Sequence, residues 1–403
     1  MTTEPAPAAT AGRRNDLDWV RVGAFAFLIL YHVGMFYVTW GWHVKSDHAS
    51  RLIEPAMAIL NPWRLALLFF ISGVAIRFAS DKAATGGSFA LGKVKRLLVP
   101  VAFGMFVIVP PQAYLELRFK GEIPADIWAF YLRYISFESS WSIITPTWNH
   151  LWYVAYVFVY SLLIVPLLPL LRRAALALEP QAERPGRAGG LPLLVLPALP
   201  LLFYQMVLAP RFPTTHALVD DWANHASSLT MFLFGYLAAK NGGFWRAVDR
   251  ALPLAGAVSL GLAAALFAER ASRGGMAVSR DHLMAVGALR VIYAWATILA
   301  ILGLAQRYLN RGNAALSYLG EAVLPYYILH QTIIVVVAYQ MIGAGVPAGL
   351  EAAIIIVATV GGCVLIHEFA IRRSRWLRPL FGLKPTPAPL RAAAGAAPAP
   401  AQG

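Results

Sequence analysis

Residues 18–43 read DWVRVGAFAFLILYHVGMFYVTWGWH, an apolar stretch of membrane-spanning length that also carries an aspartate, an arginine and a histidine. The eleven steps from Arg21 to His32 turn a helix by about 20° more than three full turns, so both side chains share one face roughly 16 Å apart. Asp18 precedes Arg21 by three residues and leans toward the same face. Ionisable groups inside a membrane helix are costly and usually face a partner, a cavity or a substrate path. The alternative is that Arg21 extends to the interface and that His32 is a hydrogen-bonded core histidine.

The composition predicts an all-α integral membrane protein. Of the 403 residues, 59% are hydrophobic and 13% are charged, whereas soluble domains carry about 25% charged residues. Apolar windows of about 20 residues predict a polytopic helical bundle with about ten transmembrane helices. These windows cover about 18–42, 52–79, 97–118, 149–171, 191–210, 222–240, 251–268, 282–306, 314–341 and 346–370.

The distribution of basic residues predicts the topology. Most of the 34 lysines and arginines fall on the side that holds the N-terminus, so we expect a multi-pass protein of the cell inner (plasma) membrane with both termini cytoplasmic. The net charge of +14 then reflects this topology and contact with anionic lipids of the bilayer. Nucleic acid is not an expected partner, because no basic stripe alternates with aromatic residues on a soluble surface.

Two compositional features limit the domain organisation and the chemistry. Residues 1–13 and the Ala/Pro-rich segment 385–403 are predicted to be disordered tails, which leaves 14–384 as one membrane domain. The single cysteine, Cys363, excludes disulfides and cysteine-ligated metal clusters, and no metal site is expected.

The second predicted span and the loop after it contain candidates for binding a donor. Arg64 lies inside the span and needs an anion, carbonyl groups or water. Ser72 and the glycine after it are small, which allows a neighbouring helix or an acyl chain to come close. The loop ends with Lys93, Lys95 and Arg96, which either bind the phosphates of a nucleotide-type donor such as coenzyme A or mark the cytoplasmic side.

Aromatic and polar side chains also gather toward the outer side. Trp42, His43, His150 and Trp152 fit either an aromatic belt at the lipid headgroups or a surface that stacks on sugar rings. In the ninth span, Pro325 is followed by a polar His-Gln-Thr triplet. A bend there predicts either a lined cavity or a structural, hydrogen-bonded kink.

The chain resembles acyltransferase family 3, a family of polytopic membrane enzymes, in four motifs that follow the family's order. These are Arg21-x10-His32 after Leu17-Asp18-Trp19, FFISG at 69–73 followed by KVKRLLVP at 93–100, HLWY at 150–153 and PYYILHQ at 325–331. The segment WHVKS at 42–46 also resembles the periplasmic-glucan succinyltransferase branch. One position departs from the family, whose basic loop commonly has two arginines three residues apart, whereas this chain has Lys93 and Arg96.

The resemblance implies an O-acyltransferase that moves a succinyl or acetyl group from cytoplasmic acyl-coenzyme A to a hydroxyl of a glycan or glycolipid on the outer side. Acyl-coenzyme A would be a co-substrate, with no permanently bound cofactor. The catalytic group would be His32 as general base, since a neutral imidazole suits proton removal near pH 7, together with Arg21 and Asp18. The donor site would consist of Lys93, Lys95, Arg96, Ser72 and Arg64. The carbohydrate acceptor would contact Trp42, His43, His150, Trp152, Tyr327, His330 and Gln331.

A different class also fits the intramembrane ionisable groups. A secondary transporter or flippase for an anionic or glycan-type substrate would use them for proton coupling or anion binding. Glycan-dependent consumption of an acyl-coenzyme A thioester separates the two classes.

Arg64 also bears on the identity of the donor. A succinyl carboxylate must be paired inside the membrane, whereas an acetyl group has no such need. The alternative is that Arg64 pairs with an acidic residue of another span or with water.

Overall fold

The computed structural model describes residues 14–183 and 190–385, and in these residues it contains helices and loops but no strand. Eight helices there are long and apolar enough to cross a membrane. They are α1 (Asn15–Tyr37), α2 (Glu54–Lys82), the composite helix Gly86–Phe119, the composite helix Leu191–Leu208, α12 (Gly242–Arg273), α13 (Arg280–Tyr308), α14 (Ala314–Met341) and the composite helix Ala348–Ile371. The prediction of an all-α, multi-pass membrane bundle is confirmed. The predicted tails, 1–13 and 385–403, lie outside the described residues except for Pro385.

The composite helices contain short π-helical segments. The first is built from α3 (Gly86–Lys93), η1 (Val94–Leu98), α4 (Val99–Phe103), η2 (Gly104–Ile108) and α5 (Pro110–Phe119). The second is built from α9 (Leu191–Val195), α10 (Ala198–Phe203) and η4 (Tyr204–Leu208), and the third from α15 (Ala348–Leu365) and η5 (Ile366–Ile371). The remaining short helices are α6 (Ile127–Ile135), η3 (Asn149–Leu151) and α16 (Leu377–Leu380).

Two of the ten predicted spans differ from a full crossing. The span predicted at 149–171 is broken into η3 with α7 (Trp152–Leu163) and α8 (Leu168–Glu183), which meet at 92°. Pro166 lies in the break, where it cannot donate a helical hydrogen bond. The span predicted at 222–240 is α11 (Trp222–Ala238), which at 17 residues is shorter than the eight candidate spans. The described residues thus hold eight spans, or nine if the bent pair is one span.

The first helix ends earlier than predicted. The apolar stretch suggested a helix through His43, but α1 ends at Tyr37 and residues 38–53 fold back as a loop that carries Trp42 and His43. Lys45 closes the end of α1, because its Nζ donates hydrogen bonds of 2.7 Å to the carbonyl oxygens of both Met35 and Val38. Burial lowers the pKa of this lysine to about 8, although the charge of Glu54 opposes the shift.

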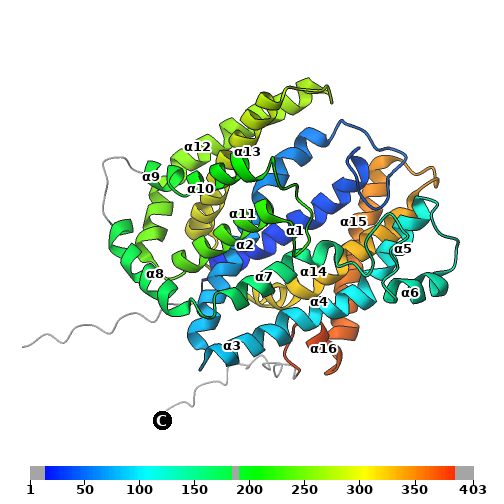
Figure 1. Ribbon diagram of the computed structural model, residues 1–403, viewed down its shortest axis with the longest axis horizontal. Coiled ribbons are helices and arrows are strands. Elements are labelled where there is room, and N and C mark those ends of the chain that lie inside the picture. Colours follow the sequence, from blue (N-terminus) through cyan, green and yellow to red (C-terminus); the bar gives the residue numbers. More distant parts are fainter. Residues whose placement is uncertain (1–13, 184–189, 386–403) are drawn as a thin grey trace, which may run out of the picture.

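The central helices are α1 and α2, drawn in blue in Figure 1, with α12 and α13 on one side and α14 and α15 on the other. One hydrophobic core joins α2 to α7, α11, α12 and α13. A second core joins α1 to α14 and the composite helix Ala348–Ile371. Since α1 borders both cores, residues on its different faces meet both halves of the bundle.

The two ends of the described chain lie at the same end of the bundle. Near the start of α1, the indole nitrogen of Trp19 donates to the carbonyl of Arg311, which precedes α14. Close to the other terminus, Arg378 lies 3.3 Å from Glu321 in the second turn of α14. We call the opposite end, where α1 finishes and α2 begins, the outer end. The assignment of that end to the outside remains a prediction from the charge distribution.

A loop at the outer end, residues 209–221, is held by the buried carboxylate of Asp221. Its Oδ2 accepts hydrogen bonds from the Tyr156 hydroxyl at 2.5 Å, the Asn224 amide at 2.7 Å and the His216 backbone at 3.1 Å. Its Oδ1 accepts from the Thr215 backbone at 3.0 Å. Burial favours the neutral acid, but these donors outweigh it and lower the pKa of Asp221 below its usual value.

Helices α2 and α11 cross at two glycines. A Cβ atom built on Gly73 would lie 1.8 Å from the carbonyl oxygen of Phe232, and one on Gly235 would lie 1.8 Å from that of Phe70. Backbones therefore touch at this crossing, as small residues allow in membrane helices. The glycine of the FFISG motif serves helix packing.

We expect Gly73→Ala to destabilise the bundle by about 1–3 kcal/mol, because an added methyl group cannot fit without moving α11. The thermal unfolding midpoint of the purified protein in detergent should fall. Gly256→Ala is the matched control, since nothing lies within 4 Å of a Cβ atom at that position of α12. Equal midpoints for both variants would contradict the close crossing.

We expect Asp221→Asn to destabilise the protein by about 1.5–3 kcal/mol at neutral pH, the range for hydrogen bonds to a charged group. A folded-state pKa below the ordinary value of about 3.9 means that this stabilisation is complete above that value and is lost as the pH falls below it. Unfolding midpoints measured between pH 3 and pH 7 should therefore depend less on pH in the variant. The exposed neighbour Asp220 provides the control, Asp220→Asn; a wild-type pH profile in Asp221→Asn would refute the assignment.

Candidate active site

A cavity of about 910 Å³ lies at the outer ends of α1, α2, α5, α7 and α14. We call it the histidine cavity. Its walls bring together eight of the residues that the sequence singled out. They are His32, Trp42, His43, Arg64, His150, Trp152, Tyr327 and Gln331.

Two histidines from α1 and α14 form the centre of the site. Nδ1 of His32 lies 2.9 Å from Nε2 of His330, and the two rings are inclined by only 9°. His32 is partly exposed and lines the cavity, whereas His330 is fully buried behind it. Arg21 also faces α14, donating at 3.4 Å to the carbonyl of Gly320, so the common face of Arg21 and His32 is the face that packs on α14.

The hydrogen bonds of His330 fix the protonation of the pair. Its Nδ1 lies 2.7 Å from the carbonyl oxygen of Tyr327 and 3.2 Å from that of Tyr326. A carbonyl can only accept, so Nδ1 of neutral His330 carries the proton and Nε2 has a free lone pair. Nδ1 of His32 must then donate to His330, which leaves Nε2 of His32 as the basic atom of a neutral pair.

A third histidine completes the cluster. The His150 ring meets His330 edge to face with ring centroids 5.1 Å apart, and its Nε2 donates to the carbonyl of Ile328 at 3.2 Å. Its own carbonyl accepts a hydrogen bond from the Tyr327 hydroxyl. The buried Nδ1 of His150 has no hydrogen-bond partner among the described residues. In the neutral ring this nitrogen is an acceptor, so it can accept a hydrogen bond from a hydroxyl group.

Arg64 is a buried cation in the wall of the same cavity. Only 4% of its surface is exposed, and its guanidinium lies over the Tyr31 ring at 3.3 Å from the centroid. One hydrogen bond of 3.1 Å joins Nη2 to Asn61, while Nε and Nη1 have no partner within residues 14–183 and 190–385. The described residues place no carboxylate in an ion pair with Arg64. The N–H bonds of Nε and Nη1 are free to donate to an anion such as a carboxylate.

A hydrogen-bonded chain joins the side chains at the outer rim. His43 donates from Nδ1 to Glu116 at 2.5 Å and accepts at Nε2 from the amide of Gln331 at 2.9 Å. The same amide donates to Gln112 at 3.1 Å, and Gln112 in turn accepts from Asn149. These bonds orient the polar wall of the cavity around the histidines.

Two residues predicted to be catalytic, Arg21 and Asp18, lie apart from this cavity, as do the residues predicted to bind the donor, with the exception of Arg64. Arg21 is paired with Asp18 at 3.3 Å near the start of α1. This end lies opposite the outer end, and we call it the cytoplasmic end on the same prediction from charge. At the same end, Lys93 is partly exposed and Lys95 and Arg96 are exposed. None of these five residues lines the histidine cavity.

Ser72 lies between these two groups. Its hydroxyl is 2.6 Å from the hydroxyl of Tyr153, which also donates to the carbonyl of Leu68. Along α2, Ser72 is eight residues beyond Arg64, which is about 12 Å toward the cytoplasmic end. The Ser72–Tyr153 pair therefore lies between Arg21 and the floor of the cavity.

Several site residues were not predicted from the sequence. Tyr31, Asn61, Gln112, Glu116 and Asn149 support or line the site through contacts between distant segments. Glu116 gave the clearest signal, because it is an acidic residue inside a predicted span. Among the described residues, no group of three or more His, Cys, Asp or Glu side chains is arranged to hold a metal ion.

Comparison with known proteins identifies the family. An acyltransferase-domain family model matches residues 14–368, which include every residue that lines the histidine cavity. Searches of curated proteins and of solved structures gave no match. The match covers far more than half of the chain and agrees with its multi-pass helical structure. The chain therefore belongs to acyltransferase family 3, and this membership implies a membrane-bound transferase of acyl groups.

Proposed function

We propose that this acyltransferase transfers a succinyl group from cytoplasmic succinyl-coenzyme A to a hydroxyl of a glycan or glycolipid at the outer side of the cell inner membrane. The observation that carries the proposal is one cavity wall that holds both His32, backed by His330, and the unpaired cation Arg64. The WHVKS segment at 42–46, which resembles the periplasmic-glucan succinyltransferase branch, supports the same donor and acceptor.

The histidine pair would activate the acceptor. Nε2 of His32 takes the proton of the acceptor hydroxyl while the hydroxyl oxygen attacks the carbonyl carbon of the thioester. As the carbon–sulfur bond breaks, the thiolate of coenzyme A leaves and takes the proton from His32. The products are an ester and a free thiol, and the imidazole returns to its neutral form. During the step, the Nδ1–H of the His32 imidazolium keeps its hydrogen bond to Nε2 of His330. This bond stabilises the charged form of His32.

Arg64 would bind the free carboxylate of the succinyl group. A buried carboxylate must be paired, and two nitrogens of the guanidinium, Nε and Nη1, have no partner among the described residues. Since Arg64 and His32 line the same cavity, the carboxylate end of the acyl group would face Arg64 and the thioester end would face His32. The alternative is that an acidic residue of another span pairs with Arg64. The contacts of Arg64 in the described residues are with Asn61 and Tyr31, which do not support this alternative.

The two ends of the bundle would bind the two substrates. At the cytoplasmic end, Lys93, Lys95 and Arg96 are available to the phosphates of the donor. Arg21, paired with Asp18, lies on the face of α1 that leads toward His32. At the outer end, Trp42 and Trp152 provide aromatic surfaces for sugar rings, and His43, His150 and Gln331 provide polar contacts.

His330 fits a positioning role better than the acceptor contact suggested by its sequence motif. It is fully buried, does not line the cavity, and uses both ring nitrogens in hydrogen bonds to His32 and to backbone carbonyls. Tyr327, in contrast, lines the cavity and holds His150 through its hydroxyl.

The first test concerns the general base. His32→Ala should leave insertion intact and lower kcat by about 10²–10⁴-fold, measured as release of coenzyme A from labelled succinyl-coenzyme A in the presence of a glucan. A transporter would show binding or flux without thioester cleavage. His48→Ala is the matched control, because His48 is exposed and lies outside the cavity.

In the same series, His330→Ala should lower kcat and leave the KM for the glucan nearly unchanged. Wild-type turnover in His32→Ala would eliminate His32 as the base. A large rise in the glucan KM of His330→Ala would instead favour direct contact between His330 and the acceptor.

The second test concerns the donor. Arg64→Gln should lower kcat/KM for succinyl-coenzyme A by about 1.5–3 kcal/mol, the range for a hydrogen bond to a charged group, and should spare acetyl-coenzyme A. Equal losses with both donors would make Arg64 a structural residue. A wild-type enzyme that accepts only acetyl-coenzyme A would refute the succinyl assignment.

A further inference from the structure

A second cavity, of about 600 Å³, lies beside the histidine cavity and is bounded by α2, α10, η4, α11, α12 and α13. We call it the arginine cavity. Five residues belong to the walls of both cavities: Asn61, Leu65, Trp152, Thr214 and His216. A molecule bound in one cavity is therefore next to the other.

The arginine cavity has an excess of positive charge. Arg270, Arg273 and Arg290 line it, and no aspartate or glutamate does. Arg270 is paired with Glu54, and Nε of Arg273 lies 3.3 Å from Glu269. Arg290 is partly exposed and forms no hydrogen bond or close ion pair with residues 14–183 or 190–385, although the charge of Glu269, already bonded to Arg273, also acts on it. It lies ten residues inside α13, about 15 Å from the start of the helix, where an unpaired cation is costly.

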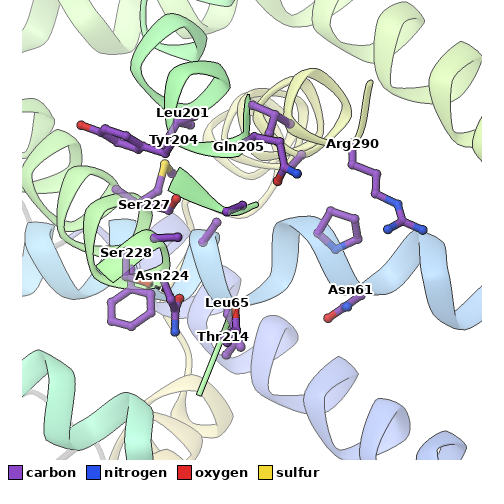
Figure 2. Close-up of a pocket in the computed structure, with 18 of the residues that line it drawn as sticks. Asn61, Leu65, Leu201, Tyr204, Gln205, Thr214, Asn224, Ser227, Ser228 and Arg290 are labelled. Carbon is purple, nitrogen blue, oxygen red and sulfur yellow. Dashed lines mark hydrogen bonds between the residues drawn. The ribbon is translucent and has the colours of Figure 1, made fainter. Parts of the chain in front are cut away.

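The opposite wall is polar but uncharged. Figure 2 shows Arg290 beside Asn61 on one side of the cavity and Asn224, Ser227 and Ser228 on the other. Gln205 and Ser227 make no hydrogen bond within the described part of the chain, so both are free to bind hydroxyl groups. Amide and hydroxyl side chains of this kind bind sugars.

An aromatic surface continues this wall. The rings of Trp152 and His216 are stacked with centroids 4.3 Å apart, and both residues line the two cavities. Loop residue His216 is held in place by the Asp221 carboxylate. A sugar that bridges the two cavities would contact this stacked pair.

We propose that the arginine cavity binds a phosphate group carried by the acyl acceptor, with Arg290 as the principal ligand. This inference rests on the proposed function and specifies its acceptor: the hydroxyl to be acylated would lie in the histidine cavity, and the phosphate would lie in the neighbouring one. A guanidinium group can donate two parallel hydrogen bonds to two oxygens of a phosphate. A doubly charged anion also suits a wall with three arginines. The phosphate belongs either to a soluble glycan or to a lipid headgroup, because the helix Leu191–Leu208 beside the cavity is mostly exposed on the outside of the bundle.

Binding measurements test the site without relying on catalysis. The full-length protein in dodecyl maltoside, a detergent without phosphate, would be titrated calorimetrically with glucose 6-phosphate, glucose and glucuronate. We expect glucose 6-phosphate to bind at least tenfold more tightly than glucose, and Arg290→Gln to remove this preference. Arg290→Lys should retain part of it. Arg280→Gln is the matched control, since Arg280 is an exposed arginine at the start of the same helix and lies outside the cavity.

The outcomes separate the sources of the phosphate. A rise in the unfolding midpoint in nanodiscs that contain phosphatidylglycerol, absent in Arg290→Gln, would support the site and assign the phosphate to a lipid headgroup. Equal affinities for glucose 6-phosphate and glucose in the wild type would overturn the proposal even if the variants failed to fold. Tighter binding of glucuronate than of glucose 6-phosphate would overturn the phosphate assignment. Since none of these readings uses acyl transfer, loss of phosphate binding and failure of the proposed activity remain distinguishable.

Discussion

The hydrogen bond between His32 and His330 joins α1 to α14 at the centre of the bundle, and the arrangement of the site depends on it. Its direction is set by the backbone of α14, because the Tyr327 carbonyl can only accept a proton from His330. The same short segment of α14 also holds η3, through the Ile328 carbonyl and the Tyr327 hydroxyl. One turn of helix thus orients all three histidines, and no charged partner is needed to fix their tautomers.

Two cations lie at similar depths on either side of a shared wall. Arg64 is ten residues from the start of α2, and Arg290 is ten residues from the start of α13. Neither forms a close ion pair with a carboxylate of the described chain, although Glu269 acts on Arg290 from farther away. Arg64 is buried, and removing such a charge from water costs several kcal/mol. The Tyr31 ring offsets only part of this cost for Arg64. Such sites are most stable when an anion is bound. The two cations therefore favour two separate negative groups. In the proposed reaction the succinyl donor would provide one and the phosphorylated acceptor the other.

The sequence predicted features that depend on local periodicity and missed those that depend on contacts between distant segments. The ninth span matches α14 at both ends, and the common face of Arg21 and His32 follows from the helical repeat. The hydropathy pattern predicted that the first helix continues past Tyr37. It contains no signal that Lys45 folds back and binds the last carbonyl groups of α1. It also joined α7 to α8 across a 92° bend, although Pro166 was a visible signal for a break. The partners of His43 and Arg64 could not be inferred, since Glu116 and Tyr31 meet them only in the folded bundle.

A layer of side chains between the two ends of the bundle bears on the proposal that donor and acceptor bind on opposite sides of the membrane. Tyr153 packs against Phe69 with ring centroids 4.8 Å apart and against Tyr327 at 5.8 Å, and its hydroxyl is bonded to Ser72. This layer separates the histidine cavity from the cytoplasmic end, where Arg21 lies roughly 16 Å from His32 along α1. Under the proposed function, the extended acyl arm of the donor would pass this layer and the bulkier glycan would not. In the proposed reaction the acyl group therefore crosses the membrane as it is transferred, and both the donor's phosphates and the acceptor's sugar stay on the side from which they came.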